Sequence, residues 1–297
     1  MRFLRECKVK ERILIGTSGW GYDEWVGPFY PESLKKEEYL SYYSQIFYTN
    51  EINTTFYNIP PPWIVENWVN KTPSNFFFTA KIPKTITHDC KLDINDCMDD
   101  LHRFLIVMRP MIKSEKLLAL LVQLPPSFTK EEHFENLREF IDNYPVKRSE
   151  RSYHLVVEFR DNSWMDDEIF NYLKKKDLTY CAVIEPKLPP RMDVTNPKLA
   201  YIRFHGYGRD IWFDYDFKEE EIKEWAEKLR AVINDAEQVG IYFNNHFSGY
   251  AAKNSLMMMR ELKIKPRKDP KDINLLEIKK KSGELSKGQT GLDQFFN

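Results

Sequence analysis

The chain alternates between short apolar runs and longer segments in which apolar residues recur every three or four positions. Eight apolar runs read as strands, at residues 13–17, 47–52, 76–81, 117–124, 155–160, 179–185, 199–205 and 240–244. Helical spacing covers residues 37–45, 64–70, 97–112, 131–142, 167–175, 218–235 and 251–262. Strands that alternate with helices predict parallel β-α-β units.

Eight such units predict a closed barrel. A (β/α)₈ TIM barrel takes roughly 250 residues, which matches the span from Ile13 to Leu262. A doubly wound open sheet is the alternative, but no GxGxxG turn follows any of the strands. The sequence therefore predicts an α/β fold, a (β/α)₈ TIM barrel over residues 1–262.

The composition changes after residue 262. Residues 263–288 are rich in lysine and contain Pro266, Pro270 and Gly283, which predicts a basic, flexible linker. Within it, only residues 273–278 are apolar enough to dock on the barrel. Residues 289–297 end the chain as a separate short tail.

Charge and cysteine content narrow the class of protein. The 297 residues carry 44 basic and 45 acidic side chains, a net charge of −1, so a nucleic-acid role requires a local basic patch. The four cysteines form no CxxC pair, which disfavours a zinc site and favours reduced thiols. The apolar run 13–15 is too short for a signal peptide or a membrane span. We expect a soluble cytoplasmic protein that does not bind membranes.

The predicted barrel also indicates where functional side chains lie. Side chains alternate between the two faces of a strand, so Tyr201, Arg203 and His205 share one face of the strand at 199–205. Applied to every strand, this period directs polar residues inward at the carboxyl ends, where TIM barrels hold their active sites. These residues are Ser18, Glu51, Asn53, Lys81, Gln123, Glu158, Arg160, Glu185, Arg203, His205 and Asn244.

The mixture of charges favours phosphate or phosphodiester chemistry. Glu51, Glu158 and His205 are the predicted catalytic residues, with a glutamate as general base and the histidine as acid or base. Cations and amides would bind a substrate anion. The predicted substrate or anion ligands are Ser18, Trp20, Asn53, Lys81, Gln123, Arg160, Arg203 and Asn244. The alternative is an internal ion-pair network that only holds the barrel together.

Four of these side chains also suit a divalent metal. Glu51, Glu158, Glu185 and His205 are the candidate ligands. No HxH or HExxH spacing supports such a site, so a metal is the less favoured reading and the cofactor stays open.

Several motifs resemble one family in the order in which they occur. These motifs are IGTSGW (15–20), EINTTFY (51–57), QLP (123–125), EFR (158–160), RFHG (203–206) and YFNNH (242–246). Together they resemble the YecE-like family, domain of unknown function 72, over residues 13–262. The resemblance implies a TIM barrel but no reaction. It also implies a likeness in shape to metal-using barrels, although this chain lacks the many histidine ligands such sites need.

The tail carries a second resemblance. Gln289, Leu292, Phe295 and Phe296 have the spacing of a PCNA-interacting peptide, or PIP box. The last three lie on one side of a helical turn and would fill an apolar pocket on the sliding clamp. The alternative is that the tail folds back on the barrel. The resemblance implies PCNA as partner and a setting in DNA replication or repair.

Three functions therefore stay open. The first is a PCNA-associated barrel of DNA repair or replication that acts as a nuclease or phosphodiesterase at its charged mouth. The second is a clamp-bound module that binds DNA or protein without catalysis. The third is a metabolic barrel that acts on a small phosphorylated or sugar-like ligand.

Overall fold

Eight parallel strands form the barrel predicted from the sequence. The computed structural model describes residues 12–273 and residue 278. One sheet holds the strands in the order β1-β8-β7-β6-β5-β4-β3-β2, which confirms the (β/α)₈ architecture. The strands are β1 (Ile13–Thr17), β2 (Thr49–Ile52), β3 (Phe77–Lys81), β4 (Leu117–Gln123), β5 (His154–Glu158), β6 (Thr179–Ile184), β7 (Ala200–Phe204) and β8 (Val239–Phe243).

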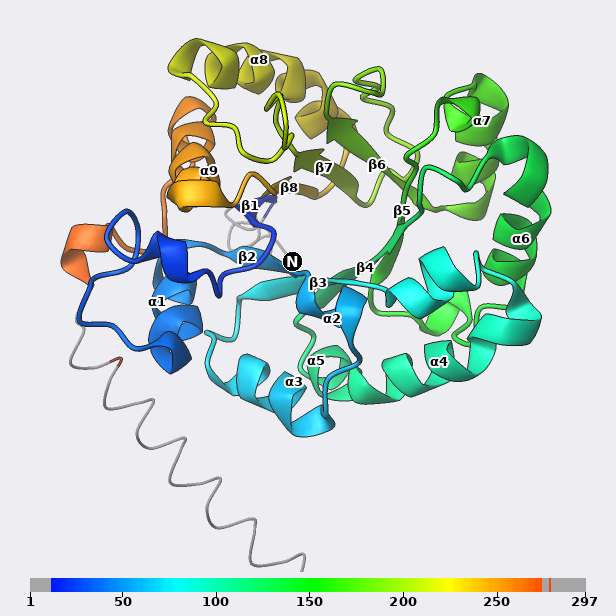
Figure 1. Cartoon of the computed structure of the whole chain (residues 1–297), viewed down its shortest axis with the longest axis horizontal. Helices are drawn as coiled ribbons and strands as arrows, with labels where there is room; N and C mark the ends of the chain where they lie inside the picture. The colour runs from blue at the N-terminus through cyan, green and yellow to red at the C-terminus, as the bar shows by residue number, and fades with distance from the viewer. Residues whose placement is uncertain (1–11, 274–277, 279–297) are drawn as a thin grey trace, which may run out of the picture.

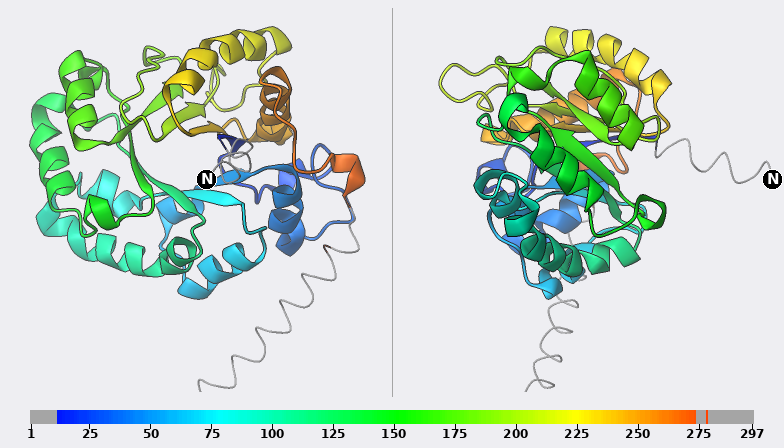
Figure 2. Two further views of the ribbon diagram at one scale, coloured as in Figure 1. Left: turned by 180° about the vertical axis from the view of Figure 1, so that it is seen from behind. Right: turned by 90° about the vertical axis from the view of Figure 1, so that its right-hand side faces the viewer.

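Helices surround the strands (Figures 1 and 2). They are α1 (Tyr39–Ile46), α2 (Thr54–Tyr57), α3 (Pro62–Asn70), α4 (Ile94–Val107), α5 (Arg109–Lys113), α6 (Lys130–Asp142), α7 (Asp167–Lys176), α8 (Glu219–Asp235) and α9 (Tyr250–Glu261). The single helix expected over 97–112 is two helices. Pro110 has no N–H to donate and its ring crowds the preceding turn, so α4 ends before it and α5 begins.

β1 and β2 close the barrel at a narrow seam. A Cβ at Gly16 would lie 2.2 Å from the carbonyl oxygen of Thr49, so only glycine allows this approach. The Tyr43 hydroxyl enters the seam, where it accepts from the Thr17 N–H at 2.9 Å and donates to the Thr49 carbonyl at 3.1 Å. A side chain from α1 thus joins two strands.

Two apolar clusters lie on either side of the strands. The inner cluster fills the barrel and includes Leu14, Leu121, Val156 and Val183. The outer cluster lies between the strands and the helices, with residues such as Phe78. At the carboxyl ends of the strands, Tyr201 and charged residues cover the inner cluster. The polar side chains there therefore lie directly on apolar ones.

The predicted flexible linker begins as ordered chain. The backbone N–H groups of Arg267 and Lys268 donate to the carbonyls of Ile46 and Gln45, both at 3.0 Å, which docks this stretch against α1. Ile273 and Ile278 pack on the outer cluster, as their apolar character predicted. Residues 263–273 of the expected linker therefore pack against the barrel.

Candidate functional site

Arg203 is the centre of a buried ion network at the carboxyl ends of the strands. Its Nη2 donates to Glu51 Oε1 at 2.7 Å and its Nη1 donates to Glu158 Oε2 at 2.6 Å. Glu51 also accepts from Ser18 Oγ and from the Tyr201 hydroxyl, each at 2.6 Å. Arg203 is only 1% exposed, so each charge depends on its partners.

Arg160 continues the network toward solvent. Its Nε donates to Glu158 and its Nη1 donates to Glu185, while its Nη2 lies 2.9 Å from His205 Nε2. Burial alone would raise the pKa of Glu158, but Arg160 and Arg203 outweigh it and hold that pKa well below its usual range. Burial raises the pKa of Glu185.

His205 is a neutral imidazole in this setting. A guanidinium only donates, so the Nε2 atom that faces Arg160 accepts and carries no proton. Burial, with Arg160 and Arg203 nearby, lowers the pKa of His205 well below its usual value. The Asn244 side-chain amide lies 3.0 Å from Nδ1 and so fixes the ring from its other edge.

Lys81 differs from the two arginines in its partners. Its Nζ donates to Gln123 Oε1 at 2.6 Å and lies 4.1 Å from the centre of the Phe56 ring. Burial lowers its pKa to about 7, and the positive charges of Arg203 and Arg160 add to that effect. The neutral amine is therefore populated near neutral pH.

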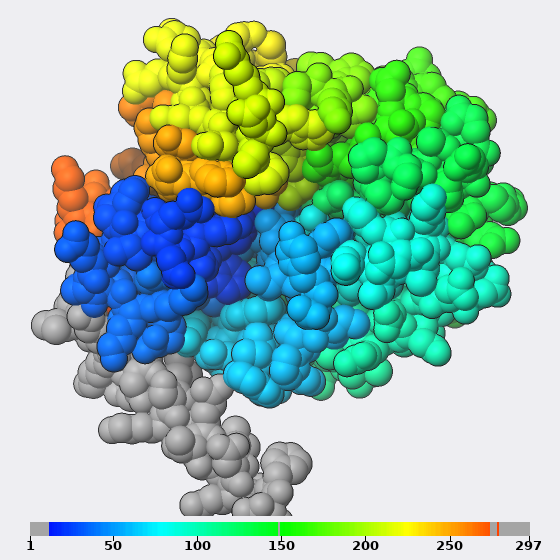
Figure 3. Space-filling model, in the orientation of Figure 1, coloured from blue at the N-terminus to red at the C-terminus, as the bar shows by residue number. Residues whose placement is uncertain are grey.

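A cavity of about 320 Å³ opens above this network. Its lining is mostly cationic, amide and aromatic, and consists of Tyr22, Asn53, Thr54, Tyr57, Lys81, Gln123, Arg160, Arg203, Phe213, Asn244 and His246. The segments that follow β1, β2 and β7 meet near the middle of this face (Figure 3). Two lining residues hold buried polar atoms, Arg203 Nε and Asn53 Oδ1, that have no hydrogen-bond partner among the described residues. Such atoms are costly unless a ligand or water pairs with them.

The structure separates the predicted site residues into two layers. Asn53, Lys81, Gln123, Arg160, Arg203 and Asn244 line the cavity. The predicted catalytic residues lie beneath them: Glu51 and Glu158 are 0% exposed and His205 is 2% exposed. Two predicted substrate ligands lie elsewhere. Ser18 is buried on Glu51, and Trp20 packs edge-on against Trp68 of α3 at 5.7 Å.

The four metal candidates do not form a metal site. Both oxygens of Glu51 and both of Glu158 already accept hydrogen bonds from cations or hydroxyls. Arg160 lies between Glu158, Glu185 and His205 and contacts all three, which puts a positive charge where an ion would sit. Within residues 12–273, no three His, Cys, Asp or Glu side chains are grouped to hold a metal.

The cavity has an aromatic wall, of which the aromatic residues after the first two strands indicated Tyr22 and Tyr57, whereas sequence reasoning missed Phe213. Tyr22 and His246 stack with their rings parallel at 4.6 Å, and Phe213 lies 5.3 Å from His246. Tyr57 is 66% exposed at the rim. These residues come from the segments after β1, β2, β7 and β8, Tyr57 from α2, where no strand period applies. Their aromatic character was the one available signal.

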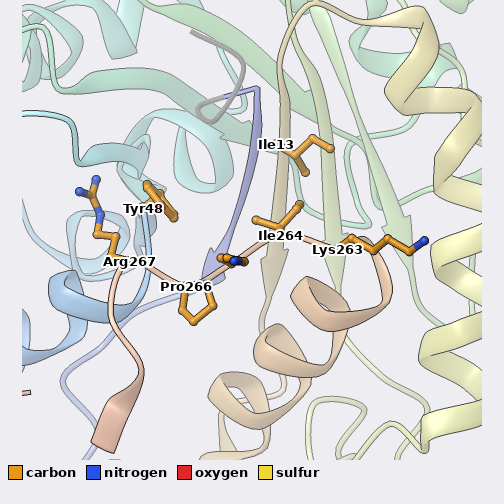
Figure 4. A pocket seen from close by; sticks show the side chains of 7 residues that line it. Ile13, Tyr48, Lys263, Ile264, Pro266 and Arg267 are labelled. Atoms are coloured by element: carbon orange, nitrogen blue, oxygen red, sulfur yellow. The ribbon is translucent and has the colours of Figure 1, made fainter. Parts of the chain in front are cut away.

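A larger cavity, about 520 Å³, lies at the opposite end of the barrel. Ile13 and Tyr48 line it from the amino ends of β1 and β2, and residues 263–267 cross beside them (Figure 4). The ion network does not reach it. We therefore place the candidate site in the smaller cavity, since polar groups converge there.

Two further expectations concern membranes and the tail. Among the described residues, no helix is long and apolar enough to cross a membrane.

The predicted clamp-binding residues 289–296 lie outside the described part of the chain, so their role stays a prediction.

Fold and site together define a TIM barrel with a cation-lined cavity at the carboxyl ends of its strands. The chain belongs to the family described as protein of unknown function DUF72, whose model matches residues 14–274.

Relatives cover nearly all of the barrel. The chain is 32% identical to a DUF72 family protein of Thermotoga maritima whose crystal structure superposes with a TM-score of 0.76, over 84% of this chain and 99% of that one. A DUF72 family protein of Enterococcus faecalis gives a TM-score of 0.73 at 26% identity, over 84% and 95% of the two chains. The UPF0759 protein YunF of Bacillus subtilis is 26% identical over 85% of this chain and 95% of its own length. The family resemblance seen in the motifs is thereby confirmed.

Proposed function

We propose that this protein is an enzyme that acts on a small phosphorylated ligand at the carboxyl end of the barrel. One observation carries the proposal. The cavity is lined by Lys81, Arg160 and Arg203, whereas the carboxylates that partner the two arginines lie beneath it. A ligand in the cavity therefore meets donors and positive charge rather than glutamate oxygens. This arrangement favours an anion such as a phosphoryl group.

The unpartnered atoms support a polar ligand. Arg203 Nε needs an acceptor and Asn53 Oδ1 needs a donor. A phosphate oxygen would satisfy the first, and a hydroxyl of a sugar would satisfy the second. The aromatic wall of Tyr22, Phe213 and His246 would pack against a ring. A phosphorylated sugar or a mononucleotide carries all three features.

The size of the cavity limits the ligand. At about 320 Å³ it is at the small end of the range for ligand pockets. One phosphorylated ring fits such a volume, and a duplex does not. In this proposal three glutamates hold Arg160 and Arg203 in place rather than touch the ligand, so Glu51, Glu158 and Glu185 are positioning residues.

Binding of sulfate tests the anion site directly. Sulfate keeps its charge between pH 5 and 9, and calorimetry with the full chain measures its affinity. We expect sulfate, ribose 5-phosphate and a nucleoside monophosphate to bind, and ribose and the nucleoside to bind far more weakly. Lys81→Met removes one charge-assisted hydrogen bond, so affinity should fall about 10- to 100-fold. Arg209→Met, on an exposed residue of the loop after β7, should leave affinity unchanged. Equal binding of phosphorylated and unphosphorylated ligands would overturn the proposal.

A second candidate rests on the tail. We infer from the Gln289, Leu292, Phe295 and Phe296 spacing that the chain binds PCNA, which would bring the barrel to DNA. A nuclease or phosphodiesterase role would then require a single nucleotide, terminal or flipped out, to enter the cavity. A non-catalytic clamp-bound module would bind DNA without cleaving it.

Clamp binding has a direct test. The full chain and the variant Phe295→Ala/Phe296→Ala are titrated against a PCNA ring, and the variant should lose binding. Cleavage of abasic or nicked DNA, measured with and without Mg²⁺, separates the nuclease from the non-catalytic module. Equal clamp binding by both chains would remove the DNA setting and leave the small-ligand enzyme.

A further inference from the structure

Lys81 differs from the two arginines at the barrel mouth, because no carboxylate in the described part of the chain pairs with it. Arg160 pairs with Glu158 and Glu185, and Arg203 pairs with Glu51 and Glu158. The contacts of Lys81 Nζ are instead the Gln123 amide oxygen, at 2.6 Å, and the face of the Phe56 ring. Among the described residues, no carboxylate forms an ion pair with it within 4.0 Å. A buried ammonium with only neutral partners is poorly stabilised.

The neutral amine is consequently well populated. Burial and the two arginines lower the pKa of Lys81 to about 7, against the opposing effect of Glu158 and Glu51, so the neutral amine is populated near neutral pH. An ordinary surface lysine, with a pKa near 10.4, holds about a thousandfold less neutral amine at that pH. Desolvation beside other cations is a known way to activate a lysine as a nucleophile.

The surroundings also hold the amine in one place. Lys81 ends β3, and its side chain lies between the Gln123 side chain from β4 and the Phe56 ring from α2. Gln123 accepts one N–H, which orients Nζ. Lys81 lines the same cavity as Arg160 and Arg203, so a phosphate on the arginines brings the rest of a small ligand to the amine.

We propose that Lys81 forms an imine with the carbonyl group of a phosphorylated aldehyde or ketone, a step that rests on the anion site proposed above. The neutral Nζ adds to the carbonyl carbon to give a carbinolamine. Loss of water then forms the C=N bond: the carbonyl oxygen leaves with both amine protons. No oxidant or reductant is needed, and hydrolysis reverses the step. The substrate class is thereby narrowed to phosphorylated sugars in an open-chain carbonyl form, or similar carbonyl phosphates.

Trapping with borohydride tests this inference. Pyridoxal 5′-phosphate serves as the probe because it carries both an aldehyde and a phosphate. The full chain is incubated with it at pH 7, reduced with borohydride, digested and analysed by mass spectrometry. We expect one dominant secondary amine, at Lys81, whose formation sulfate suppresses. Dihydroxyacetone phosphate with the same reduction should label the same residue.

Two variants complete the design. Lys81→Arg keeps a positive charge in the cavity, so it should still bind sulfate within a few-fold of the unmodified chain while losing the adduct. Lys84→Arg, at an exposed lysine three residues away, should keep both sulfate binding and the adduct.

The outcomes separate the imine from the anion site. Sulfate binding without preferential labelling of Lys81 overturns the imine and leaves the proposed function intact. Labelling of Lys81 that sulfate does not suppress would show a reactive lysine with no phosphate site beside it, and that result overturns the carbonyl-phosphate substrate class. Failure of sulfate to bind at all overturns the proposed function itself.

Discussion

Replacing Glu158 by glutamine tests whether the ion network holds the barrel mouth together. Glu158 is fully buried and accepts from Arg160 Nε on one oxygen and from Arg203 Nη1 on the other. Glutamine has nearly the same shape, but it offers one acceptor and one NH₂ group. An N–H of the amide must then face an N–H of an arginine, and two guanidinium charges lose their shared partner.

The magnitude follows from the burial. Removing one member of a buried ion pair costs about 3–5 kcal/mol. At roughly 2.1 cal/mol/K per residue, a chain of 297 residues has an unfolding entropy near 0.6 kcal/mol/K at its midpoint. Glu158→Gln should therefore lower Tm by about 5–8 °C and lower the free energy of unfolding in urea by the same few kcal/mol.

The assay is urea unfolding followed by circular dichroism, with Glu224→Gln on the exposed face of α8 as control. Glu224 pairs with Lys228 at the surface, so its loss should cost less than about 1 kcal/mol. In the double variant Glu158→Gln/Arg160→Gln, the Glu51–Arg203 pair stays balanced. The double variant should lose less free energy of unfolding than the two single variants lose together, by about 1–3 kcal/mol. The network would be refuted if the losses of unfolding free energy in the two single variants add up to that of the double variant. It would also be refuted if Glu158→Gln costs as little stability as Glu224→Gln.

Three further outcomes are expected. Tyr43→Phe leaves the Thr17 N–H and the Thr49 carbonyl unpaired at the barrel seam and should cost about 2–5 kcal/mol in urea unfolding. Tyr172→Phe should be near neutral, because the Tyr172 hydroxyl has no hydrogen-bond partner within residues 12–273. Sulfate affinity should fall as pH rises through about 7, because Lys81 loses its proton there, and Lys81→Met should flatten this profile in calorimetry. His205 has a folded-state pKa below its unfolded value near 6.5, so the unfolded chain binds the proton first and stability falls as pH drops below 6.5. The contribution of His205 to this loss of unfolding free energy is at most about 1.4 kcal/mol per pH unit, and His205→Gln should remove it. If the variant loses stability with falling pH as steeply as the unmodified chain, that result would contradict a neutral His205.

Much of this molecule can be predicted from local sequence patterns. The number of strands, their parallel arrangement and the inward direction of Arg203 and His205 follow from period two and from the helices between the strands. Helix ends were less predictable. The break at Pro110 follows from a missing N–H, but the helical spacing of apolar residues runs through it.

What sequence by itself determined is the set of side chains that meet at the mouth of the barrel. A two-residue period fixes the face on which each side chain lies. It does not fix how deep the charged end of a long side chain lies, nor which partner it takes, because both depend on the stagger of neighbouring strands. Only the tertiary structure decided that Glu51 and Glu158 lie under the arginines, and that Lys81 pairs with no carboxylate in the described part of the chain. It also decided that aromatic residues from the segments after four strands form the cavity wall.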